Sequence, residues 1–170
     1  MAPGPIVVTG ADGFIGSALV TQFVTTGRPV VAAIRQHPAG AAAKPHHREA
    51  GDLATASEAA LDELVAGAAA IVHLAGRAHV LADTAPDSGA LYQAANVVAT
   101  QRLAAAAVRT GVPRFVFAST IKVHGEATAP GRPFQANDPL APHEAYARSN
   151  VEAERALATI ATGTSLDAIV

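Results

Sequence analysis

The sequence of 170 residues predicts one α/β domain with a doubly wound parallel sheet. Short runs rich in β-branched residues alternate along the chain with longer Ala-rich stretches. This alternation is typical of βαβ units, in which a helix returns the chain to the start of the next parallel strand. The short runs are apolar almost throughout, as expected when helices cover both faces of a sheet. No linker or internal repeat divides the chain.

The first half of the chain is predicted to contain four strands and two helices. The run Ile6–Val8 follows a Pro/Gly turn and forms the first strand. A helix follows over 14–26, where apolar residues recur near helical spacing, and Gly27 and Pro29 end it. A second helix is predicted over 57–66, with apolar and acidic residues on different faces. The remaining predictions here are strands over 30–34, 49–53 and 70–74, and a surface loop over 36–47.

The second half predicts two longer helices and two strands. The helix over 92–110 is Ala-rich and ends at Gly111. The helix over 145–162 ends in the same way, before Gly163. Strands are predicted over 114–118 and 165–170, and a Pro-containing loop over 125–143.

The composition excludes several classes of protein and site. Half of the residues are hydrophobic, so the chain can bury a core, and Cys is absent, so disulfides and thiolate sites are excluded. The net charge of -2 argues against a nucleic-acid partner or an anionic membrane surface. No apolar run reaches the ~18 residues that span a bilayer, and no basic segment of a secretion signal precedes the first strand. We therefore expect a cytoplasmic protein.

The segment after the first strand is the strongest functional signal. It reads Thr9-Gly10-Ala11-Asp12-Gly13-Phe14-Ile15-Gly16 and opens the first helix. Glycines in this context let a pyrophosphate approach backbone N–H groups at a helix N-terminus. Gly16 lets the helix pack closely on the strand. The alternative is a tight turn with a purely structural role.

These residues resemble the TGxxGFIG fingerprint of the extended short-chain dehydrogenase/reductase superfamily, and within it the NAD-dependent epimerase/dehydratase family. The resemblance implies a Rossmann fold that binds NAD or NADP and acts mostly on nucleotide sugars. Further segments match in the family's order and extend the resemblance over essentially the whole chain: Gly51-Asp52-Leu53, His73-Leu74-Ala75-Gly76, Asn96–Thr100, 114–126 and 146–154. The sequences RAHV, FASTIKVHGE and PGRPF look most like bacterial nucleotide-sugar 4-epimerases of polysaccharide biosynthesis.

The family's catalysis uses a Tyr, a Ser or Thr, and a Lys four residues after the Tyr. Here Tyr146 matches the base and Thr120 matches the hydroxyl donor, but Asn150 stands at the Lys position. Asn has no charge with which to stabilise a phenolate, and an ordinary Tyr with a pKa of ~10 is only ~0.1% ionised at pH 7. Lys122 is an alternative source of charge. Without the Tyr's partners, a packed helix aromatic would be the simplest interpretation of Tyr146.

The resemblance also implies binding residues. Cofactor contacts fall on Gly10, Asp12, Gly13, Phe14, Ile15, Gly16, Arg35, Asp52, Leu53, Leu74, Ala75, Gly76, Asn96, Ser119 and Tyr146, and substrate contacts on Arg77, His79, Ser119 and His124. No acidic residue follows the second strand, and Arg35 would suit a 2′-phosphate or be a surface arginine; we expect NAD, with NADP open. His124 is equally compatible with a surface position, and His46-His47 is expected to be solvated loop rather than a metal site.

The chain stops in the family's sixth strand, before most of the substrate-binding lobe. We therefore expect residues 1–170 to form the NAD(P)-binding Rossmann domain, C-terminally truncated relative to the family. Helices 92–110 and 145–162 carry the family's dimer contact and predict a homodimer. Three functions remain open: a UDP-hexose 4-epimerase-like oxidoreductase, a catalytically inactive dinucleotide-binding module, and a degenerate remnant.

Overall fold

A six-stranded parallel sheet forms the centre of the molecule. The computed structural model describes residues 4–37, 44–78 and 87–170. The strand order is β3-β2-β1-β4-β5-β6, and every neighbouring pair is parallel. The strands are β1 (Ile6–Thr9), β2 (Val30–Ile34), β3 (His47–Glu49), β4 (Ala70–His73), β5 (Arg114–Phe117) and β6 (Asp167–Ile169).

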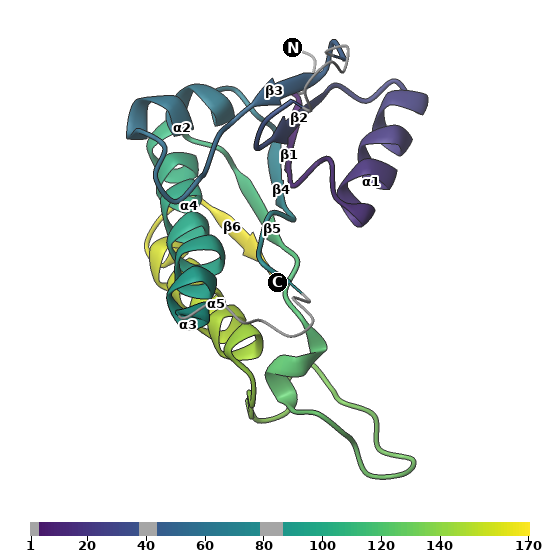
Figure 1. The fold of residues 1–170 in the computed structure, drawn as a ribbon. Coiled ribbons are helices and arrows are strands. Elements are labelled where there is room, and N and C mark those ends of the chain that lie inside the picture. Colours follow the sequence, from purple (N-terminus) through teal and green to yellow (C-terminus); the bar gives the residue numbers. More distant parts are fainter. Residues whose placement is uncertain (1–3, 38–43, 79–86) are drawn as a thin grey trace.

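Helices lie on both faces of this sheet (Figure 1). Helix α1 covers one face, while α2, α4 and α5 cover the other. The prediction of a doubly wound Rossmann-like domain is thus confirmed. The helices are α1 (Phe14–Thr25), α2 (Glu58–Val65), α3 (Ser88–Tyr92), the π-helix η1 (Gln93–Val98), α4 (Ala99–Thr110), the 3-10 helix η2 (Ile121–His124) and α5 (Ala145–Ala161).

Small side chains allow α4 to pack tightly between α2, α5 and the sheet. Ala104, Ala106 and Ala107 are fully buried there, together with Leu103 and the strand residue Phe115. Alanine costs no side-chain entropy in a helix and lets neighbouring backbones approach. The Ala-rich composition therefore serves close helix packing rather than a bulky core.

Local signals set the ends of two helices, of which the end of α4 at Gly111 was predicted from the sequence. The Ser57 hydroxyl accepts a hydrogen bond from the N–H of Ala60 and caps α2. Gly111 ends α4 with a left-handed φ of 71°.

Two sequence predictions are corrected. The third strand is His47–Glu49, not 49–53. Gly51 has a φ of +63° and the Asp52 carboxylate accepts a hydrogen bond from the N–H of Ala54, so the chain turns where a strand was expected. The helix predicted over 92–110 begins earlier, at Ser88, and contains the π-helical turn η1.

The strand order creates a crevice above the middle of the sheet. β1 is paired with β2 on one side and β4 on the other, so the chain leaves neighbouring strands in opposite directions. In doubly wound folds such a switch point is where ligands bind, at the carboxyl ends of the strands. Across the described ranges, no helix is long and apolar enough to cross a membrane.

Candidate dinucleotide-binding site

A cleft of about 330 Å³ lies at this switch point. The carboxyl ends of β1, β2 and β4 and the segments that follow them form its walls. Its lining includes most of the residues predicted to contact a cofactor: Gly10, Asp12, Gly13, Arg35, Asp52, Leu53, Leu74, Ala75 and Gly76. The structure therefore brings together predicted residues from four separate segments of the chain.

The glycine loop approaches its neighbours too closely for side chains. A Cβ on Gly10, whose φ is +63°, would lie 2.8 Å from the Ala75 nitrogen, and one on Gly16 would lie 2.1 Å from the Gly10 oxygen. Gly13 caps α1 and lines the cleft. The first backbone N–H groups of α1 therefore face the cleft across a surface without side chains, which suits a pyrophosphate.

The side chains of Phe14 and Ile15 point away from the cleft, so these residues could reach a ligand there only through their backbone. Their side chains are 96% and 64% exposed, and neither lines the cleft. The prediction that they contact a cofactor therefore applies to their N–H groups at the start of α1. Gly16 is buried beneath them and sets the distance between α1 and the loop.

A buried histidine joins the glycine loop to the middle of the domain. The His73 Nδ1 lies 2.7 Å from the Thr9 hydroxyl, and its Nε2 lies 3.0 Å from the Thr100 hydroxyl. Thr100 donates to the carbonyl of Asn96 at 2.6 Å, so it accepts from Nε2–H of His73. Thr9 then donates to Nδ1 and accepts from the N–H groups of Leu74 and Ala75.

These bonds require a neutral His73. Burial lowers the pKa of His73 to about 4, and a proton on Nδ1 would break its bond from Thr9. The neutral ring therefore connects the glycine loop, the end of β4 and η1 through hydrogen bonds and fixes their relative positions. The sequence identified His73 only by resemblance, and Thr9 and Thr100 were missed as site residues.

Asn96 extends this network to α5. Its side-chain oxygen accepts from the N–H of Arg77 at 2.7 Å, and its nitrogen donates to the Arg77 carbonyl at 3.1 Å and the Ser149 hydroxyl at 2.9 Å. Ser149 in turn donates to the Tyr146 carbonyl. Asn96, which was predicted to touch the cofactor, is thus a buried residue of the π-helical turn whose side chain fixes the backbone of Arg77 in the segment after β4.

A smaller pocket of about 70 Å³ continues from the end of the cleft. Gly76, Arg77, Asn96, Tyr146 and Asn150 contribute to its lining. Asn150 is 4% exposed, and its side-chain nitrogen donates to the Tyr146 carbonyl at 2.9 Å. The pocket therefore places Asn150 beside Tyr146, where the resemblance predicts a lysine.

Lys122 does not line this pocket and instead forms ion pairs with two carboxylates. Its ammonium lies 3.1 Å from Glu144 and 3.5 Å from Glu126, and the hydrogen bond to Glu144 is the first cause of its raised pKa. Glu144 caps α5. We interpret Lys122 as an anchor for that helix end rather than a substitute for the missing lysine.

The remaining predicted residues lie around the start of η2. The Thr120 hydroxyl accepts from the N–H of Lys122 at 3.3 Å, which leaves its own proton unused in that bond. Ser119 donates to the Glu154 carboxylate on α5, so its side chain supports the strand end. The His124 ring packs against Phe134 at 5.7 Å. His79 lies outside the described residues.

Three comparisons with known proteins bear on this site. The model of the NAD dependent epimerase/dehydratase family matches residues 6–170. A UDP-glucose 4-epimerase of Vibrio cholerae is 34% identical over 170 residues, 99% of this chain and 50% of its own length. A dTDP-glucose 4,6-dehydratase of Streptomyces griseus is 34% identical over 167 residues, 88% of this chain and 47% of its own length.

A solved structure shows the same architecture. MoeE5 in complex with UDP-glucuronic acid and NAD superposes with a TM-score of 0.82 at 34% identity, over 97% of this chain and 52% of that one. The chain spans about half the length of the curated relatives that it matches.

Proposed function

Because this chain belongs to the NAD dependent epimerase/dehydratase family, we propose that its cleft binds NAD and that it is the dinucleotide-binding part of an enzyme that acts on a nucleotide sugar. The observation that carries this proposal is the glycine surface between Gly10 and Gly16 at the switch point of the sheet. Added side chains would fill that surface, and a pyrophosphate would use it.

The cleft offers a place for each part of a dinucleotide. The helix N-terminus of α1 would hold the pyrophosphate. Arg35 and Asp52 line the end of the cleft formed by β2 and the segment after β3, where the adenosine would lie. The smaller pocket with Tyr146 lies at the other end, after β4, and suits the nicotinamide.

Two of the chain's own residues would act on the sugar. NAD, when bound, supplies a site for hydride transfer to and from a sugar carbon. Tyr146 would exchange a proton with the sugar hydroxyl, and Thr120 would orient that hydroxyl through its unused proton. UDP-hexose 4-epimerisation is the reaction that we propose first, since a relative named UDP-glucose 4-epimerase is 34% identical over 99% of this chain.

Binding without catalysis is the second candidate, and Asn150 favours it. The neutral Asn150 carries no charge that would favour the phenolate of Tyr146, and the Lys122 ammonium is paired with two carboxylates. The two candidates predict different results when UDP-glucose is supplied with NAD: an enzyme turns it over, and a binding module does not.

We expect Asn150→Lys to raise that turnover at least tenfold over the unaltered chain, because a nearby ammonium favours an ionised phenol. The pocket of about 70 Å³ beside residue 150 gives the longer side chain room. UDP-galactose formation measures the effect, and Asn150→Met is the matched control for length without charge. Equal turnover of the Lys and Met variants would contradict the role given to charge at this position.

We also propose a homodimer through α4 and α5. A groove of about 460 Å³ crosses α2, α4 and α5 on their outer side, lined partly by Gln101, Ala105, Ala156 and Ile160. The small alanine side chains in its lining would let two helix pairs approach closely.

Sedimentation equilibrium tests this proposal. We expect a dimer at micromolar concentration and a monomer for Ala105→Glu, because the longer side chain would fill the groove and hold the two helix pairs apart. Gly89→Glu on α3, where nothing lies within 4 Å of the added Cβ, is the control that should remain dimeric. A monomeric unaltered chain would refute the dimer.

A further inference from the structure

A second groove of about 350 Å³ lies between α1 and the edge strand β3. Asp12 of the glycine loop lines both this groove and the dinucleotide cleft, so the two are neighbours. Lys44, His46 and His47 form its wall on the β3 side, and α1 contributes Ser17 and Thr21. Helix α1 contains no charged residue.

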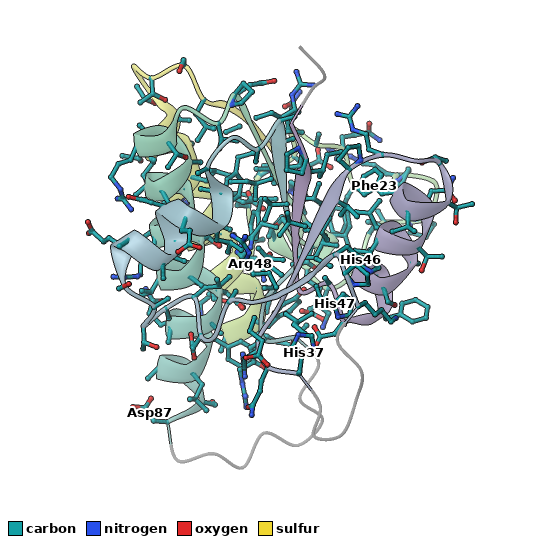
Figure 2. The ribbon with its side chains drawn as sticks, turned by 90° about the horizontal axis from the view of Figure 1, so that it is seen from above. Phe23, His37, His46, His47, Arg48 and Asp87 are labelled. Atoms are coloured by element: carbon teal, nitrogen blue, oxygen red, sulfur yellow. The ribbon has the colours of Figure 1, made fainter. Side chains whose placement is uncertain are left out.

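Two imidazoles, those of His46 and His47, line this groove, and a third, that of His37, stacks on His47 from another segment of the chain. The His37 and His47 rings stack with centroids 5.8 Å apart, and the His46 and His47 rings meet edge to face at 4.9 Å. Figure 2 shows the three labelled rings together beside α1. The pairing of His47 with Ala32 places its side chain on the α1 face of the sheet. Arg48 turns to the opposite face and donates to the Glu63 carbonyl of α2.

The cluster is connected to the dinucleotide cleft through Asp12, which lines both the cleft and the groove, and through the chain segment that begins at the cleft residue Arg35. His37 follows Arg35 by two residues, and its N–H donates to the Glu49 carboxylate at 2.7 Å. The backbone carbonyl of Arg35 accepts a hydrogen bond from the N–H of Gly51 at 3.1 Å. In doubly wound folds the residues after the second strand contact the 2′ position of that ribose.

We propose that His37, His46 and His47 form a subsite for the 2′-phosphate of NADPH, which gains affinity as the imidazoles take up protons. The proposal rests on the proposed function, because the phosphate reaches the groove only when the cleft holds the dinucleotide. A phosphate monoester carries nearly two negative charges near pH 7 and accepts several hydrogen bonds. Imidazole N–H groups and the Lys44 ammonium are matching donors.

The charges around His47 explain the expected pH dependence. Burial lowers the pKa of His47, and the charges of His46, Lys44 and His37 lower it further, while Asp12 opposes them. Glu49 is a further acidic group at this edge, and Arg35 and Arg48 are further basic groups, with Arg48 turned to the opposite face of the sheet. A bound phosphate offsets the repulsion among the imidazoles, so its binding should be accompanied by proton uptake.

Metal binding is a weaker interpretation of the same cluster. Within the described part of the chain, no group of three His, Asp or Glu side chains has an arrangement that would hold a metal ion. The stacked rings face one another rather than a common point.

Binding of NADPH and of NADH at about pH 6.5 and about pH 8 tests the proposal. Titration below about pH 6 is avoided, because the phosphate itself then becomes protonated. Nicotinamide fluorescence gives both dissociation constants, and the chain has no Trp to interfere. For the unaltered chain we expect the affinity for NADPH relative to NADH to increase about tenfold from the higher to the lower pH.

The double variant His37→Gln, His47→Gln should lose this increase and still bind NADH. His143→Gln, which changes an exposed histidine of the loop before α5, is the matched control and should keep it. Asp12→Asn should raise the affinity for NADPH at both pH values, because it removes the acidic neighbour of the groove.

The outcomes separate the two proposals. NADH binding with a selectivity that is independent of pH, or that is equally pH-dependent in the double variant, overturns the subsite and leaves the proposed function intact. Failure of the unaltered chain to bind either dinucleotide overturns both.

Discussion

Gly13→Val should weaken NADH binding at least about 100-fold, equivalent to about 2.7 kcal/mol, while the chain stays folded. Gly13 lines the cleft at the start of α1, so the new methyl groups would occupy the space over the N–H groups of the helix. Its φ of -73° suits any residue, and an added Cβ meets only the Gly10 oxygen, at 3.1 Å. The effect therefore falls on binding rather than on folding.

Other glycines of the loop would give an ambiguous result. A Cβ on Gly16 would lie 2.1 Å from a backbone oxygen, so its substitution would disturb the fold as well. Gly89→Val is the matched control, since α3 leaves open space around that position. Fluorescence titration measures binding and thermal melting measures folding. An NADH affinity within threefold of the unaltered value in folded Gly13→Val would refute the assigned role.

Acid should destabilise the chain through His73 before most carboxylates titrate. The pKa of His73 is about 4 in the folded chain, against 6.5 for an ordinary histidine, because the ring is buried. Between these values the unfolded chain takes up a proton that the folded chain does not. The free energy of unfolding therefore falls as the pH drops from 6.5 to 4, by a total of about 3 kcal/mol, and His73 contributes no pH dependence above this window.

Urea unfolding at a series of pH values measures this effect. His73→Gln should be less stable at neutral pH, because the bonds to Thr9 and Thr100 are disturbed, but it should lose less stability between pH 6.5 and 4. His143→Gln should retain the full loss. NMR of the imidazole nitrogens should show a neutral ring with its proton on Nε2 at pH 6. A protonated His73 at that pH would contradict the network.

Local patterns explain why so much of the sheet was predictable. The strands β2 and β4 are mainly apolar runs that begin shortly after a proline or a glycine, and Gly111 marks a helix end by its own backbone preference. The glycine loop is also a local feature, because one continuous segment contains the strand end, the turn and the helix start. The fold class and the cleft followed from these segments.

Contacts between segments that are distant in the sequence were harder to predict. Thr9 and His73 are 64 positions apart in the sequence, and their bond depends on the pairing of β1 with β4. The histidine cluster depends in the same way on the pairing of β2 with β3. The short edge strand was misplaced because His47–Glu49 is polar, and its pairing with β2, rather than an apolar run, defines it.

Equilibrium titration of the unaltered chain with NADH tests the central claim most directly. Because residues of the described part of this chain form the glycine surface and the cleft, we predict one saturable site per chain with a dissociation constant below about 1 mM, within the range of enzyme–substrate affinities. A chain that unfolds cooperatively yet shows no saturable change in nicotinamide fluorescence up to that concentration would contradict the account.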